Sequence, residues 1–99
     1  MLEVTLEEFK ATLSDPSPPE VSPALAALWH DARGDWNQSH NIAQDIDDAD
    51  GSWIHAYLHR KEGDLGNAGY WYVRAGREMP AKSVTLEQEW ADIARQLVT

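Results

Sequence analysis

The sequence contains no cysteine, which excludes disulfide bonds, thiolate chemistry and cysteine-type zinc sites. It also has no apolar run near the roughly 20 residues that a membrane-spanning helix needs. The first four residues lack a basic start followed by an apolar stretch, so no signal peptide is expected. These absences predict a small soluble protein of the cytoplasm.

Positive charge is scarce. The 99 residues include 17 acidic and 8 basic side chains, which gives a formal net charge of −9. This balance argues against binding to a phosphate backbone or to anionic lipid, so we expect neither a nucleic-acid partner nor a membrane partner. The length allows one domain. A hydrophobic share of 42% with five tryptophans is typical of a folded chain.

The remaining signals are those of helices. Capping residues and helix-stopping glycines or prolines recur along the chain, and no segment alternates apolar and polar residues convincingly, so no sheet is expected. The predicted fold class is all-α, a five-helix bundle built around two helical hairpins with a C-terminal capping helix. A single domain over 1–99 is expected to comprise an N-terminal helix (1–13), a Pro/Ser-rich linker (14–22), two hairpins (23–80) and a final helical part (81–99).

The capping residues and the helix-stopping glycines and prolines place the four hairpin helices near 24–33, 36–45, 53–62 and 65–78. The acidic stretch 45–51 is expected to be a loop, with Ser52 as the cap of the helix that follows. A calcium loop is excluded there. If Gly51 is set as the glycine of such a loop, Ile46 and Tyr57 occupy positions that need oxygen ligands.

The two hairpins repeat each other at an offset of 29 residues, the distance from Gly34 to Gly63. The matching pairs are Ala27 with Ala56, His30 with His59, Gly34 with Gly63 and Asp35 with Asp64. In each unit the glycine can adopt the left-handed conformation that ends a helix, and the aspartate can cap the next helix. The offset therefore predicts two turns of the same construction.

The second unit resembles a tetratricopeptide (TPR) repeat, whose pattern is W-x2-L-G-x2-Y, then A-x3-F, then P. The residues that carry this resemblance are Ala56, Gly63-Asp64, Ala68-x3-Tyr72, Ala75 and Pro80. Ser52, His55 and His59 depart from it, because they stand where the family has Trp, Leu and Tyr. The resemblance covers about 23–80 and implies a TPR-like fold, with the last helix as its cap, more than it implies a function. The run 55–77 also resembles a segment of small bacterial proteins to which we can assign no activity.

Histidines are the strongest candidates for chemistry. His55 and His59 are four residues apart, so they share one helix face and can both reach one metal ion. A third ligand is expected from His30 or His40. The H-E-x-x-H zinc hydrolase pattern is excluded, since Ala56 stands in place of the catalytic glutamate. In the alternative, which the sequence favours, both histidines lie in the core and form hydrogen bonds with Trp, Tyr or backbone groups.

Aromatic and basic residues form the second candidate site. One helix face is expected to present Tyr70, Arg74 and Arg77, which could hold a carboxylate or phosphate. In the alternative, the two arginines pair with acidic groups of the protein itself, such as those in the loop 45–51. Five tryptophans predict a shared aromatic core from which some indoles line a groove. The full set expected to bind a ligand or partner is Trp53, Tyr57, His59, Arg60, Tyr70, Trp71, Arg74 and Arg77.

No catalytic motif selects an enzyme, because the chain lacks G-x-S-x-G, a P-loop and G-x-G-x-x-G. The leading functional hypothesis is a protein or peptide interaction module with a groove lined by Trp, His and Arg. The alternative is a protein that binds a metal or small anion through its histidines, and the third is a small enzyme with a histidine acid or base. No cofactor is expected apart from a divalent metal under the alternative. A homodimer is also expected, because two repeats are fewer than the roughly three that a repeat array needs.

Overall fold

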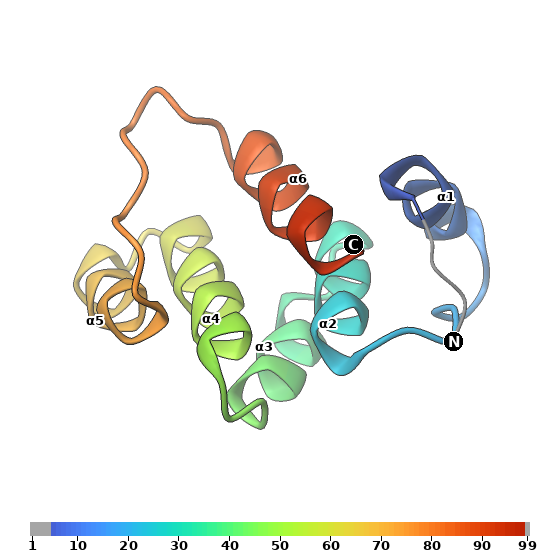
Figure 1. Ribbon diagram of the computed structural model, residues 1–99, viewed down its shortest axis with the longest axis horizontal. Coiled ribbons are helices and arrows are strands. Elements are labelled where there is room, and N and C mark those ends of the chain that lie inside the picture. Colours follow the sequence, from blue (N-terminus) through green and yellow to red (C-terminus); the bar gives the residue numbers. More distant parts are fainter. Residues whose placement is uncertain (1–4, 99) are drawn as a thin grey trace.

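Helix boundaries follow the capping signals of the sequence. A computed structural model of the protein describes residues 5–98, and all of its regular structure in that range is helical (Figure 1). The elements are α1 (Leu6–Ala11), a 3-10 turn (Thr12–Ser14), α2 (Pro23–Ala32), α3 (Trp36–Gln44), α4 (Ala49–Lys61), α5 (Leu65–Ala75) and α6 (Leu86–Leu97). The all-α class is confirmed. The expected count of five helices is wrong, because this range holds six.

Local chemistry explains where most helices start. Thr5 and Thr85 each form a capping box with the residue three positions later, Glu8 and Gln88. In each box the threonine side chain accepts from a free backbone N–H, and the partner side chain accepts from the threonine N–H. Pro23 occupies the first turn of α2 behind the cap Ser22, a position where its missing N–H costs nothing.

The two Gly-Asp turns are built in the same way, as their spacing predicts. Gly34 and Gly63 have φ angles of +84° and +87°, a region that side chains with a Cβ rarely adopt. Asp35 and Asp64 then cap α3 and α5 through their carboxylates. The helical hairpins α2–α3 and α4–α5 therefore have equivalent turns.

Two boundaries differ from the prediction. Helix α4 begins at Ala49 with Asp48 as its cap, so the loop before it is shorter than expected. Gly51 lies in the first turn, where an added Cβ would approach the carbonyl oxygen of Ile46 to 2.4 Å, and only glycine allows this contact. Helix α5 ends at Ala75 because Gly76 adopts a left-handed conformation with φ +71°, which leaves the chain up to Pro80 outside the helix.

Helix α4 is the centre of the bundle. Its residues 51–58 are buried on every side of the helix, since α2, α3, α5 and α6 all pack against it. Helix α1 packs against α6, where Phe9 stacks on Trp90 with ring centroids 5.9 Å apart. In the described part of the chain, no helix has the length and apolar character needed to cross a membrane.

The tryptophans lie mainly in or against this core, as expected. Trp29, Trp53 and Trp90 are buried, whereas Trp36 and Trp71 are half-buried. Three indole N–H groups donate to main-chain oxygens of other elements: Trp29 to Thr12, Trp36 to Leu58 and Trp90 to Leu28. These bonds satisfy the indole donors in apolar surroundings and fix the orientation of the rings.

Candidate metal centre

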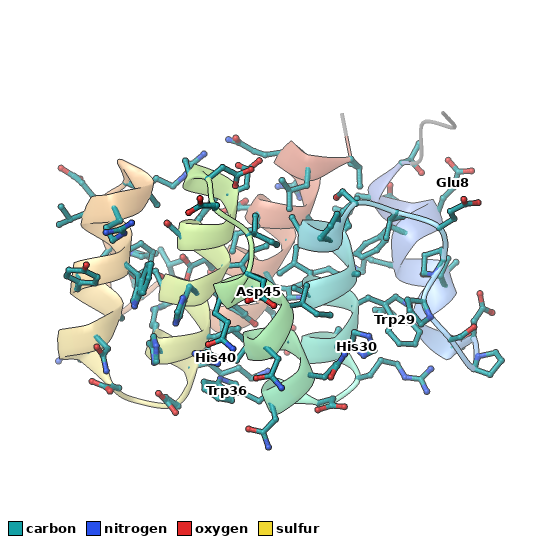
Figure 2. All side chains as sticks on the ribbon, turned by 90° about the horizontal axis from the view of Figure 1, so that it is seen from below. Glu8, Trp29, His30, Trp36, His40 and Asp45 are labelled. Carbon is teal, nitrogen blue, oxygen red and sulfur yellow. The ribbon has the colours of Figure 1, made fainter. Side chains whose placement is uncertain are left out.

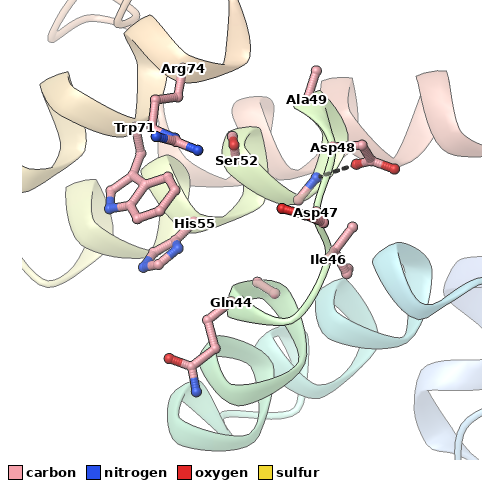
Figure 3. Close-up of a pocket in the computed structure, with 11 residues that line it drawn as sticks. Gln44, Ile46, Asp47, Asp48, Ala49, Ser52, His55, Trp71 and Arg74 are labelled. Carbon is pink, nitrogen blue, oxygen red and sulfur yellow. Dashed lines mark hydrogen bonds between the residues drawn. The ribbon is translucent and has the colours of Figure 1, made fainter.

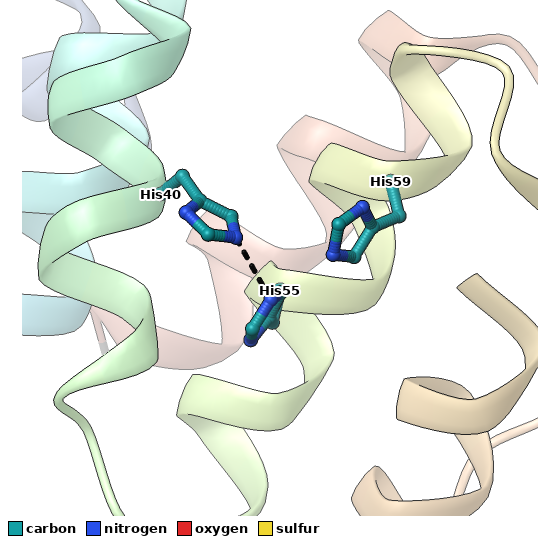
Figure 4. Close-up of side chains that lie close together, drawn as sticks. All are labelled: His40, His55 and His59. Atoms are coloured by element: carbon teal, nitrogen blue, oxygen red, sulfur yellow. Dashed lines mark hydrogen bonds between the residues drawn. The ribbon is translucent and has the colours of Figure 1, made fainter. Parts of the chain in front are cut away.

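Three histidines meet where α3 packs against α4. His40 comes from α3, and His55 and His59 come from α4 one turn apart (Figure 4). One ring nitrogen from each of the three lies within 4.8 Å of the other two. The Nε2 atoms of His40 and His55 are 3.0 Å apart and share a hydrogen bond.

Two tryptophans hold these rings. Trp36 stacks on His40 with centroids 4.8 Å apart and an interplanar angle of 10°, and Trp71 stacks on His55 at 4.0 Å and 16°. Trp36 is itself fixed by its hydrogen bond to the Leu58 carbonyl of α4. Figure 2 shows Trp36 and His40 together on α3. The imidazoles are therefore positioned before any ligand arrives.

The surroundings favour neutral imidazoles. Burial, followed by the neighbouring His40 and His59, lowers the pKa of His55 to about 4. The pKa of His40 is lowered as well, first by burial and then by His59, against a small opposing effect of Glu62. A neutral imidazole is the form that binds a metal ion, so two of the rings are in the binding form at neutral pH.

His59 has a carboxylate partner. Its Nδ1 lies 2.7 Å from Oε1 of Glu62, which is three residues later and half-exposed. When Nδ1 donates to a carboxylate, Nε2 is left as the acceptor that faces a metal ion, an arrangement common among metal-binding histidines. Asp64 lies close to the same pair, and the three form a second group of neighbouring ligand atoms.

The distances fit a tetrahedral ion. Ligand nitrogens bound to zinc lie about 3.3 Å from one another if each bond is about 2.05 Å long. The separation of 3.0 Å between His40 and His55 is close to this value, and the His59 nitrogen lies within 4.8 Å of both. Three protein ligands leave one position open, which is the arrangement of catalytic rather than structural zinc sites.

The structure selects between the two proposed third ligands. His40 joins the group, whereas His30 packs edge-on against Trp29 with centroids 5.1 Å apart and lies nearer α1 (Figure 2). The repeat made His30 equivalent to His59, but equivalent positions in two hairpins are not neighbours here. The sequence feature that could have indicated His40 is its position four residues after Trp36. This spacing puts both side chains on one helix face, and their rings stack there.

The wider partner-binding set does not lie on one open face. Trp53 and Tyr57 are buried, and Arg60 pairs with the buried Glu89. Arg77 turns away from Arg74, and its guanidinium carbon lies 3.4 Å from the centre of the Trp53 ring. The members that remain together at the surface next to the histidines are Tyr70, Trp71 and Arg74.

Sequence reasoning missed two buried carboxylates. Glu89 of α6 accepts from the Tyr72 hydroxyl of α5 at 2.6 Å and from Arg60 of α4 at 2.8 Å. Burial, and then the contact with Glu89, raises the pKa of Tyr72. This network fastens α4, α5 and α6 together.

The second carboxylate, Asp31 of α2, does the same for α2 and α4. It accepts from the Tyr57 hydroxyl and from the Lys61 ammonium group, both at 2.9 Å. Burial and the nearby Asp31 charge raise the pKa of Tyr57. Nothing in the local sequence marks Asp31 or Glu89, because each is one acidic residue among 17.

A pocket of about 280 Å³ adjoins the histidine cluster (Figure 3). His55 belongs to the cluster and to the pocket wall, and Trp71 continues this wall. The opposite side is formed by the end of α3 and the segment that leads into α4. A ligand in this pocket would therefore lie beside the imidazole of His55.

Comparison with known proteins gives no family for this chain. No protein-family model matches it, no curated protein is significantly similar to it, and no solved structure resembles it significantly. Its function has to be argued from the geometry of the site alone.

Proposed function

We propose that the protein binds one transition-metal ion of the zinc type through His40, His55 and His59. The observation that carries this proposal is the convergence of one ring nitrogen from each histidine within 4.8 Å. Imidazole suits zinc, copper, nickel and iron, and the chain offers no thiolate that would select a softer ion. The absence of cysteine from the whole sequence makes histidine the best nitrogen or sulfur ligand available.

The environment of the rings supports binding over a purely structural role. A core histidine usually donates to and accepts from backbone or side-chain groups that stay neutral or carry the opposite charge. Here His55 faces His40, and burial followed by the presence of this neighbouring ring lowers the pKa of His55. A cation between them would use both lone pairs, and Glu62 would orient the third ligand as a second-shell carboxylate.

Calorimetric titration of chelator-treated protein with zinc tests this proposal. The wild type should bind one equivalent, and its melting temperature should rise, because ligand that binds only the folded state stabilises it. His40→Gln and His59→Gln should each weaken binding at least tenfold. His30→Gln is the matched control, since this ring lies outside the cluster, and it should bind like the wild type.

Binding should also release protons and weaken below about pH 6, because the ligands must be neutral. Equal affinity in His30→Gln and His40→Gln would show that zinc binds elsewhere. The absence of any stoichiometric zinc binding by the wild type would leave the three rings as a structural cluster.

A second candidate function rests on α5. Its outer surface exposes large apolar side chains, with Val73 79% and Leu65 50% accessible. We infer that a second copy of the chain covers this face, as expected for a TPR-like array that has only two hairpins. The equivalent Gly-Asp turns of α2–α3 and α4–α5 support the TPR-like interpretation.

A further inference from the structure

The pocket beside His55 is lined by one basic side chain, Arg74, and by two acidic ones, Asp47 and Asp48. Arg74 of α5 lies on one side, and Asp47 of the segment before α4 lies on the other (Figure 3). Within residues 5–98, neither forms an ion pair. We propose that this pocket binds a small zwitterion of the amino-acid type, whose carboxylate contacts Arg74 and whose ammonium group contacts Asp47.

Arg74 is held in place without being neutralised. Its Nη1 donates to the Tyr70 hydroxyl at 3.2 Å, and its guanidinium carbon lies 5.2 Å from the centre of the Trp71 ring. Stacking on an aromatic ring orients a guanidinium group and leaves its edge free to donate two parallel hydrogen bonds to a carboxylate.

The acidic side of the pocket consists of two aspartates that differ in their contacts. Asp48 caps α4, and its Oδ1 accepts from the Gly51 N–H at 3.0 Å. Asp47 has no such task, because no hydrogen bond or ion pair involves its carboxylate in the described part of the chain. Two carboxylates opposite one guanidinium group disfavour a dianion such as phosphate and favour a ligand that carries a positive as well as a negative charge.

The size and the walls of the pocket limit the ligand further. A volume of about 280 Å³ lies just below the usual range for small-molecule sites, which begins at about 300 Å³. Trp71 and Ile46 supply apolar surface to the pocket wall. A short aliphatic amino acid fits these features, whereas a nucleotide or a peptide does not.

Titration calorimetry on the full chain, with chelator present, tests the proposal through a set of simple probes. Glycine, β-alanine and 4-aminobutyrate carry both charges at increasing separation, and propionate and propylammonium carry one charge each. At least one of the amino acids should bind tenfold more tightly than either singly charged probe. The best of the three reports the separation between the carboxylate and ammonium sites.

Substitutions assign the two charges. Arg74→Gln should weaken the best amino acid at least tenfold and abolish any propionate binding, whereas Asp47→Asn should weaken the amino acid alone. Arg77→Gln, just beyond the end of α5, is the matched control, because this side chain lies over Trp53, and it should leave the affinity unchanged within twofold. Both tested residues are exposed, so the variants should fold.

Binding of the amino acid should not depend on the proposed metal site. His40→Gln removes a proposed metal ligand that is not part of the pocket wall, and it should retain amino-acid binding. Equal binding of propionate and of every amino acid, or an Asp47→Asn variant with wild-type affinity, would overturn the zwitterion and leave a plain carboxylate site. Failure of all five probes to bind would overturn the pocket as a ligand site.

Discussion

His40 and His55 face each other through their Nε2 atoms at 3.0 Å, so one imidazole must donate the hydrogen bond and the other must accept it. Protonation of both rings would place two donors and two positive charges in contact. The pair therefore ties the packing of α3 on α4 to a state in which at least one of the two rings is neutral.

This contact predicts a pH dependence of the metal-free protein. The pKa of His55 is about 4 in the folded state, against about 6.5 in the unfolded chain. Below pH 6.5 the unfolded state binds the extra proton, so the free energy of unfolding should fall as the pH decreases from 6.5 towards 4. Between pH 7 and pH 5 the loss should be about 1–2 kcal/mol.

Urea unfolding with chelator present measures this loss. His55→Gln should reduce the dependence in that pH range, whereas His30→Gln should keep it. A wild-type free energy of unfolding that is constant from pH 7 to pH 5 would contradict this prediction. It would show that folding does not lower the pKa of His55.

Buried Glu89 should matter far more than an exposed acid on the same helix. Glu89→Ala leaves Arg60 and Tyr72 without their partner, and removal of one member of a buried ion pair costs about 3–5 kcal/mol. Asp92→Ala breaks the exposed pair with Arg95 and should cost less than about 1 kcal/mol. Chemical unfolding compares the two variants directly, and similar losses would contradict the role assigned to Glu89.

Two glycines three residues apart should respond to alanine with opposite signs. Gly63 has a φ of +87°, so Gly63→Ala should destabilise the protein by about 1 kcal/mol. Gly66 lies in α5 with open space around it, and Gly66→Ala should stabilise by about 0.5–1 kcal/mol through better helix propensity. Thermal unfolding reads out both effects, and a stabilising Gly63→Ala would show that the turn can dispense with its left-handed residue.

Self-association through α5 is expected at micromolar concentration. Sedimentation should show a species of about twice 11.1 kDa for the wild type. Val73→Glu places a charge on the most exposed apolar side chain of α5 and should shift the protein to the monomer. Glu87→Gln, on the exposed side of α6, is a control that should leave the dimer intact. A wild type that remains monomeric would argue against the dimer.

Turns and helix caps that depend only on neighbouring residues could be predicted from the sequence. The Gly-Asp turns at 34–35 and 63–64 and the capping boxes at Thr5 and Thr85 depend on neighbouring residues alone, and all four are present. The start of α4 could not be predicted, because Ser52 and Asp48 are both good caps. The choice between them depends on the packing of Gly51 against Ile46.

The candidate site was predictable only in part, for the same reason. The helical spacing of His55 and His59 places them together without any tertiary information. His40 joins them because α3 packs against α4, a relationship between hairpins that the 29-residue repeat does not encode. Arg74 was expected either to bind an anion or to pair with acidic groups, and it forms no ion pair with any of the described residues.

The burial of α4 on all sides has a consequence for the motions of the protein. Amide hydrogens of 51–58 have no local route to solvent, so they should exchange with water only when the whole chain unfolds. Helix α1 has only six residues, and Phe9 is its one buried side chain, so its amides should exchange through local fraying. His55 lies within the slow segment, and the exchange rates of its neighbours therefore report directly on how strongly any bound ligand stabilises the entire fold.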